Sequence, residues 1–181
     1  MRFIGEFLSP TQASCWLKQL EQADWIDWQR ETFSIFGRKV QAPRTLAWFG
    51  DAGLNYRYTA LDHHAWGWPE PLQALKRDVE KKAQQPFNFL LLNRYVDGSE
   101  YMGWHRDDER GCRGSIASLS LGTPRRFSID EQTGDELAQR KNFELGDGSL
   151  LIFDGRQRHC LRASKKLLGP RINLTFRQIS L

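Results

Sequence analysis

Two histidines and a carboxylate form the most reactive pattern in this sequence. His105-Arg106-Asp107 places an imidazole and a carboxylate two residues apart, and residues at that spacing on an extended segment point to the same side. The chain has only 4 histidines, and His159, which follows an apolar segment and a turn, is the candidate for a third ligand. Two imidazoles and one carboxylate suit iron(II) and leave three coordination positions open. Zinc could use the same ligands, so these residues alone leave the metal open.

The C-terminal segment alternates polar and apolar residues with the period of a β-strand. One face would carry the polar side chains of Arg171, Asn173, Thr175 and Arg177. If this face lines an internal slot, its two guanidiniums can bind the carboxylates of a small dianionic acid through paired N–H donors. If it does not, the four polar groups face solvent. Asn93 and Tyr95 have the same spacing on another expected strand and could add an amide and a phenol.

The elements that would position these residues are two helices followed by short strands. Ser9 and Pro10 indicate the start of a helix over residues 11–20, and a second helix is expected over 72–80. Strands are expected over residues 25–36, 87–95, 115–121, 126–130, 142–145, 149–153 and 171–179. This order predicts the α+β class, with a β-sandwich or jelly-roll barrel. His63-His64 is interpreted as part of a surface loop, because adjacent strand residues point to opposite faces.

Composition limits the class of protein. The chain has 181 residues, of which 40% are hydrophobic, so it can build a sizeable core as one domain over residues 1–181. It has no apolar run long enough to span a bilayer and no secretory signal pattern, so we expect a cytoplasmic protein without a membrane partner. The 3 cysteines have no metal-ligand spacing. A net charge of +4 is compatible with an anionic partner and does not require one.

The ordered combination of these motifs resembles the signature of AlkB-type dioxygenases, which are iron(II)- and 2-oxoglutarate-dependent. The resemblance rests on His105-x-Asp107, His159, Asn93-Arg94-Tyr95 and Arg171-x-Asn173-x-Thr175-x-Arg177, with further similarity in Pro43-Arg44 and Phe87-Asn88-Phe89. Within the family, the chain is similar to the branch that repairs duplex DNA. The resemblance covers residues 30–179, and its motifs are specific in combination.

This resemblance implies a fold, a site and a reaction. The fold would be a double-stranded β-helix, or jelly-roll, in about residues 86–181, preceded in about residues 1–85 by helices and a hairpin lid that recognises the nucleotide. His105, Asp107 and His159 would bind iron(II) as the catalytic centre. The cosubstrates would be O2 and 2-oxoglutarate, the latter held by Asn93, Tyr95, Arg171, Asn173, Thr175 and Arg177. The reaction would hydroxylate N-alkyl groups of bases such as 1-methyladenine and 3-methylcytosine in DNA, releasing an aldehyde.

Substrate contacts are expected from three parts of the chain. Phe36, at the tip of a hairpin with Gly37 and Arg38, would insert into the duplex where a base has been flipped out. The segment Tyr56-Arg57-Tyr58 would form a wall of the base pocket. Asp108 and Glu109, directly after the metal carboxylate, would face a base that carries positive charge.

Other functions use the same residues and stay open at this point. The same chemistry could act on RNA, on single-stranded DNA or on a protein side chain. A barrel that binds nucleic acid without catalysis and a zinc-dependent hydrolase or isomerase are further alternatives. The main expectation is a monomeric bacterial enzyme, associated with the nucleoid, whose partner is alkylated duplex DNA.

Overall fold

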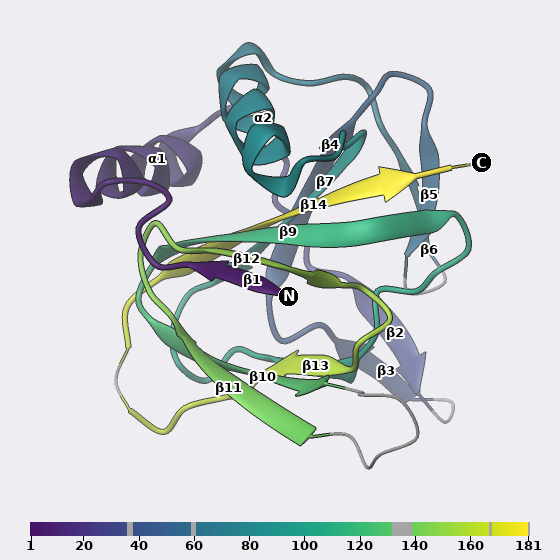
Figure 1. The fold of residues 1–181 in the computed structure, drawn as a ribbon. Coiled ribbons are helices and arrows are strands. Elements are labelled where there is room, and N and C mark those ends of the chain that lie inside the picture. The colour runs from purple at the N-terminus through teal and green to yellow at the C-terminus, as the bar shows by residue number, and fades with distance from the viewer. Residues whose placement is uncertain (36–37, 59–60, 132–138, 167, 181) are drawn as a thin grey trace.

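Two facing β-sheets, two hairpins and two helices make up the part of the chain that a computed structural model describes (Figure 1). This part comprises residues 1–35, 38–58, 61–131, 139–166 and 168–180, with the backbone alone for 33–35, 57, 58 and 61. The larger sheet has the strand order β1 (Arg2–Ile4), β12 (Leu150–Asp154), β9 (Cys112–Gly122), β14 (Arg171–Ile179), β7 (Phe89–Tyr95) and β4 (Thr45–Gly50). The smaller sheet has the order β11 (Gln139–Leu145), β10 (Arg125–Glu131), β13 (His159–Leu161) and β8 (Met102–His105). The hairpins are β2 (Thr32–Ile35) with β3 (Arg38–Gln41) and β5 (Asn55–Tyr58) with β6 (Leu61–His64).

The two helices lie where the sequence predicts them. Helix α1 (Pro10–Gln22) begins with a capping box, in which the Ser9 hydroxyl accepts from the Gln12 N–H and the Gln12 side chain accepts from the Ser9 N–H. Helix α2 (Glu70–Ala83) ends at Gln84, whose left-handed backbone (φ 57°) closes the last turn. No helix among the described residues is long and apolar enough to cross a membrane.

The larger sheet uses its two faces differently. Ile172, Leu174 and Phe176 of β14 lie in the main apolar core, which also contains buried residues of both helices. The alternate residues of β14 belong to the opposite face, where Arg171 pairs with Tyr95 and Asn173 pairs with Asn93 of β7. In Figure 1, the helices cover one side of this sheet and the smaller sheet lies on the other. The alternation predicted for residues 171–177 therefore separates the main core from the interior of the barrel.

A second apolar cluster fills the space between the sheets. It combines side chains from the larger sheet, such as Ile116 and Phe153, with Phe127, Ile129 and Leu161 of the smaller sheet. Two antiparallel sheets that share such a core form a double-stranded β-helix. The predicted α+β class, with a jelly-roll barrel behind N-terminal helices, is confirmed.

The prediction of a strand over residues 25–36 is wrong for most of its length. Among the residues of this segment that the structure describes, 25–35, only Thr32–Ile35 is a strand, and Gln29 makes an isolated bridge to Leu46. The preceding residues include Trp25 and Trp28, which pack against the main core without strand alternation. The surface-loop interpretation of His63-His64 is also wrong, because His63 lies in β6, is 1% exposed and has its Nε2 2.8 Å from Oε1 of Glu31.

Candidate metal and cosubstrate site

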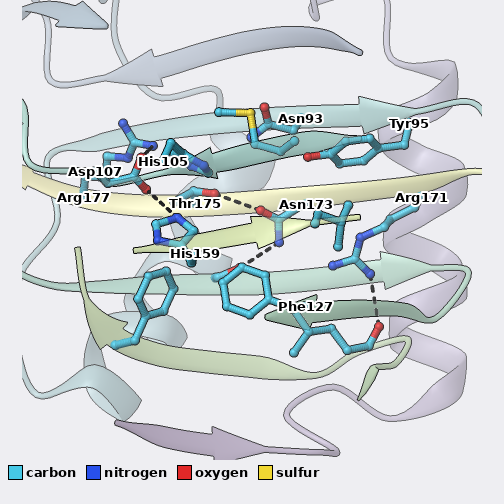
Figure 2. A pocket seen from close by; sticks show the side chains of 15 residues that line it. Asn93, Tyr95, His105, Asp107, Phe127, His159, Arg171, Asn173, Thr175 and Arg177 are labelled. Atoms are coloured by element: carbon cyan, nitrogen blue, oxygen red, sulfur yellow. Dashed lines mark hydrogen bonds and ion pairs between the residues drawn. The ribbon is translucent and has the colours of Figure 1, made fainter. Parts of the chain in front are cut away.

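Three potential metal ligands converge between the sheets at one end of the barrel (Figure 2). His105 ends β8, Asp107 follows it by two residues, and His159 begins β13 directly opposite His105. Their ligand atoms all lie within 4.8 Å of one another. The Nε2 atoms of His105 and His159 lie 3.6 and 3.7 Å from the two carboxylate oxygens of Asp107. The three side chains therefore surround a space in which each could donate to one ion.

Backbone carbonyls fix the orientation of both imidazoles. The Nδ1 of His105 lies 2.8 Å from the carbonyl of Gly103, and the Nδ1 of His159 lies 2.8 Å from the carbonyl of Gln157. A ring that donates from Nδ1 to a carbonyl keeps an unprotonated Nε2, which is the state that binds a metal. In both residues, Nε2 is the atom nearer the Asp107 carboxylate.

Electrostatics favours neutral imidazoles and an ionised carboxylate. Burial and the neighbouring His159 lower the pKa of His105 to about 4, and burial lowers the pKa of His159. For Asp107, burial alone would raise the pKa of the carboxyl, but the surrounding positive charge, that of Arg177 foremost, outweighs burial and holds the pKa below its usual value. Two neutral imidazoles and a carboxylate are a donor set that fits iron(II), and zinc could use the same set.

The predicted cosubstrate residues line the same cavity as the metal ligands. Its lining contains all six of them, Asn93, Tyr95, Arg171, Asn173, Thr175 and Arg177, together with His105, Asp107 and His159. Figure 2 shows Arg171 at one end of this row and the three metal-ligand candidates with Arg177 at the other. Apolar side chains, among them Phe127 and Phe153, complete the wall. The rings of these two phenylalanines lie 5.4 and 4.9 Å from the ring of His159.

The two arginines have different surroundings. The Nη2 of Arg177 lies 2.9 Å from the Asp107 carboxylate, and its Nη1 donates to the Tyr56 hydroxyl at 2.8 Å. Arg171 donates to the carbonyl of Leu145 and, at 2.7 Å, to the hydroxyl of Ser120. Its Nε is buried and has no acceptor among the described residues, and burial lowers the pKa of the group to about 10. A buried guanidinium with a donor to spare, far from the metal ligands, fits the distal carboxylate of a dianionic acid.

Only some of the residues expected to contact substrate lie at this site. Asp108 is exposed, whereas Glu109 is half-buried and accepts from the Tyr56 hydroxyl at 2.7 Å. The Tyr56 ring is 1% exposed and packs on Phe89, so the protein covers the faces on which a flipped base would stack. Arg38 is exposed on β3. Phe36 and Gly37 lie outside the described residues, as do the side chains of Arg57 and Tyr58.

Two buried arginines support the cosubstrate slot, although neither of them was assigned a role from the sequence. Arg44, in the segment before β4, donates from Nε to the Asn93 side chain at 2.6 Å. Arg125 lies with its guanidinium 5.9 Å from the centre of the Tyr95 ring and donates to backbone carbonyls of 97, 100 and 162. Arg125 alternates with Phe127 and Ile129 on β10, and this period indicates an inward-facing arginine.

Comparisons with known proteins agree with this geometry. A family profile described as the 2OG-Fe(II) oxygenase superfamily matches residues 1–177. The human protein named DNA oxidative demethylase ALKBH2 is 39% identical over 158 residues, which cover 81% of this chain and 60% of that protein. The mouse protein of the same name is 36% identical over 174 residues, covering 90% and 73%. Human alpha-ketoglutarate-dependent dioxygenase alkB homolog 3 is 31% identical over 180 residues, covering 88% and 63%. The chain thus spans 60% of the length of the human ALKBH2 relative.

Solved structures show the same fold at low sequence identity. OsALKBH1 superposes with a TM-score of 0.62 at 15% identity, covering 98% of this chain and 97% of that one. An oxidoreductase of the 2OG-Fe(II) oxygenase family from Burkholderia pseudomallei gives a TM-score of 0.61 at 12% identity, covering 96% and 81%. At these identities the likeness concerns the architecture alone.

Proposed function

Because the chain belongs to the 2OG-Fe(II) oxygenase superfamily, as an AlkB-type member of it, we propose that it removes N-alkyl groups from DNA bases by oxidation. The proposed cofactor is iron(II), and the proposed cosubstrates are 2-oxoglutarate and O2. The proposed substrates are 1-methyladenine, 3-methylcytosine and related lesions, from which the reaction releases an aldehyde and restores the base. Relatives named DNA oxidative demethylase support DNA as the substrate class.

The observation that carries this proposal is one cavity that combines two chemically different sites. His105, Asp107 and His159 supply the donor set for iron(II) at one end, and Arg171 supplies a buried cation at the other, whose Nε has no acceptor among the described residues. A five-carbon keto diacid needs both ends, because its keto-acid group chelates a metal while its distal carboxylate needs a cation. A barrel that only binds nucleic acid has no need of this combination.

Each group in the cavity then has a proposed task. The bound iron would supply the oxidation, with 2-oxoglutarate and O2, that hydroxylates the alkyl carbon attached to the base nitrogen. Arg171 and the phenol of Tyr95 would hold the distal carboxylate, and the apolar walls at Phe127 and Phe153 would exclude water. The hydroxylated base loses aldehyde without further help from the protein.

The substrate is proposed to enter at the exposed side of the metal ligands. Bases alkylated at these nitrogens carry positive charge, which the exposed carboxylate of Asp108 complements. Arg38 and Lys39 are exposed on β3 and are suited to phosphate contacts. Together with the expectation that Phe36 inserts into the stack, they support a flipped base in duplex DNA as the preferred substrate.

A turnover assay tests the reaction. Succinate should form from 2-oxoglutarate only when iron(II) is present, and an oligonucleotide with 1-methyladenine or 3-methylcytosine should stimulate its formation. His105→Ala should abolish turnover, whereas Arg77→Gln, at an exposed position of helix α2 on the other face of the larger sheet, should retain it. Full activity of His105→Ala would refute the ligand assignment.

Assays of the same lesion in duplex DNA, in single-stranded DNA and in RNA distinguish between the alternative substrates. We expect 1-methyladenine in duplex DNA to be repaired faster than in single-stranded DNA or in RNA. Phe36→Ala should lower activity on the duplex more than on the single strand, because only the duplex requires an aromatic group to replace the flipped base. Equal losses on both would count against insertion by Phe36, and faster repair of RNA would favour the RNA alternative.

A further inference from the structure

Strand β8, which carries the first metal ligand, has an irregularity directly before it. Leu161 of β13 pairs with Met102, and His159 pairs with His105, so Gly103 and Trp104 together lie opposite the single residue Cys160. Two residues opposite one is a β-bulge, which re-aims the side chains that follow it. Both Met102 and His105 line the cavity although they are three residues apart, a spacing that a regular strand would send to opposite faces.

The bulge also provides the group that orients the imidazole. The carbonyl of Gly103 is the acceptor for Nδ1 of His105, at 2.8 Å. Since Trp104 joins these two residues, any rotation of its backbone moves both the carbonyl and the ring. The placement of Nε2 of His105 therefore depends on how firmly Trp104 is held.

Trp104 is held on the side of the sheet away from the cavity by two guanidiniums. Those of Arg140 and Arg158 lie 4.4 and 4.9 Å from the centre of its ring. Neither arginine lines the cavity, and each side chain is about half exposed, so the contacts belong to the outer face of the smaller sheet. A guanidinium within about 6 Å of an indole face is attracted to it by the ring quadrupole.

Asp130 ties the two arginines to the centre of the sheet. One carboxylate oxygen lies 2.9 Å from Nε of Arg140, and the other lies 3.9 Å from Nη1 of Arg158. The Asp130 N–H also donates to the Arg158 carbonyl at 2.8 Å. The cluster of Trp104, Asp130, Arg140 and Arg158 thus links β8 to β10, β11 and the residue before β13.

The strand pair that bears the two histidines needs such a link. β8 is an edge strand of four residues, β13 has three, and they pair at only two register positions. A pair so short, with a bulge inside it, has few hydrogen bonds to fix its geometry. The outer contacts of Trp104 and Arg158 join residues adjacent to His105 and His159, and so act on both imidazoles at once.

We propose that Trp104 is a positioning residue for the metal site, held by Arg140 and Arg158 so that the bulge presents His105 to the ion. The proposal rests on the iron site proposed above. Removal of a group that orients a metal ligand in this way typically lowers metal affinity by about 10- to 100-fold. Trp104 does not line the cavity, so its effect should act through His105 and reside in metal binding.

Metal affinity and folding can be measured separately. Metal-free protein would be titrated with Mn(II) by calorimetry, and its thermal unfolding would be followed without metal. We expect Trp104→Ala to bind Mn(II) about tenfold more weakly, and Trp104→Phe, which keeps an aromatic face, to recover most of that loss. Trp66→Ala removes another indole, which is 86% exposed, and should leave the affinity unchanged.

The controls distinguish failure of this inference from failure of the metal site. Wild-type protein must bind Mn(II) and His105→Ala must not; otherwise the site itself is refuted and the inference falls with it. A Trp104→Ala protein that melts earlier but binds Mn(II) within twofold of wild type would overturn the inference. If that variant does not fold, the Arg140→Gln, Arg158→Gln double variant leaves the indole in place. It should still bind Mn(II) more weakly, and unchanged affinity would overturn the proposal.

Discussion

The Nη2 of Arg177 lies 2.9 Å from the carboxylate of Asp107, and both side chains are almost completely buried. Arg177, which the family resemblance assigns to 2-oxoglutarate, is therefore also an ion-pair partner of Asp107, one of the three candidate metal ligands. Through Nη1 it also binds the Tyr56 hydroxyl, which in turn donates to Glu109. One guanidinium connects the metal end of the cavity to a residue of the β5–β6 hairpin.

Loss of the Arg177 charge should destabilise the protein strongly. Arg177→Gln would leave the Asp107 carboxylate buried without its counter-ion, and breaking a buried pair in this way costs about 3–5 kcal/mol. Urea unfolding of the metal-free protein measures the change. Arg156→Gln, which breaks an exposed pair with Asp154, should have no measurable effect. A loss below about 1 kcal/mol for Arg177→Gln would show that the pair is not the main compensation for burying Asp107.

The buried imidazoles should make the metal-free protein sensitive to acid. The folded-state pKa of His105, about 4, lies below the value of about 6.5 for an unfolded chain. The unfolded state therefore binds a proton first as the pH falls, and stability is lost between pH 6.5 and 4. Protonation of His105 alone should lower the free energy of unfolding by about 3 kcal/mol over this pH range. Stability curves measured from pH 8 to 4 should be flatter for His105→Asn than for wild type, and curves that run parallel would contradict the prediction.

A methyl group at Gly155 should disturb the metal carboxylate. A Cβ at this position would lie 2.7 Å from the backbone oxygen of Asp107 and 2.8 Å from Cδ1 of Ile116. Overpacking of this kind lowers the free energy of unfolding by about 1–3 kcal/mol. The backbone of Asp107 must move to make room for the methyl group, and this movement should also weaken Mn(II) binding. Gly146→Ala is the matched control, because no atom lies within 4 Å of its added Cβ. Equal stability and equal metal affinity for the two variants would mean that Asp107 tolerates the displacement.

Arg171→Gln should act on the cosubstrate. Because the guanidinium lies at the far end of the cavity from the metal ligands, its removal should raise the KM for 2-oxoglutarate and leave Mn(II) affinity near wild type. A charge-assisted hydrogen bond contributes about 1.5–3 kcal/mol, which corresponds to roughly 10- to 150-fold in KM. Steady-state kinetics with varied 2-oxoglutarate tests this, with Arg126→Gln, at an exposed position, as control. An unchanged KM would remove Arg171 from the cosubstrate site.

Periodicity was sufficient to predict the parts of the site that lie on long strands. Residues 171–177 alternate strictly, and β14 has the predicted bounds and presents its polar side chains to the cavity. The pairing of His105 with His159 could be proposed from ligand chemistry, because few other histidines were available.

Short and irregular segments could not be predicted in this way. β8 and β13 have four and three residues, too few for a period to emerge, and the bulge at Gly103 and Trp104 leaves no signature in one sequence. The roles of Arg44 and Arg125 depend on contacts with residues far along the chain. For Tyr56, the residue type suggested a stacking surface, but packing on Phe89 leaves only its hydroxyl to act at the site.

The most direct test of the proposed function is a count of products from one reaction. Wild-type protein with iron(II), O2 and 2-oxoglutarate would be incubated with a 1-methyladenine duplex, and succinate, formaldehyde and restored adenine would be measured together. The proposed chemistry predicts that all three rise in equal amounts and that none forms with His159→Ala. Restored adenine without succinate, or succinate that rises with no change in the methylated base, would contradict it.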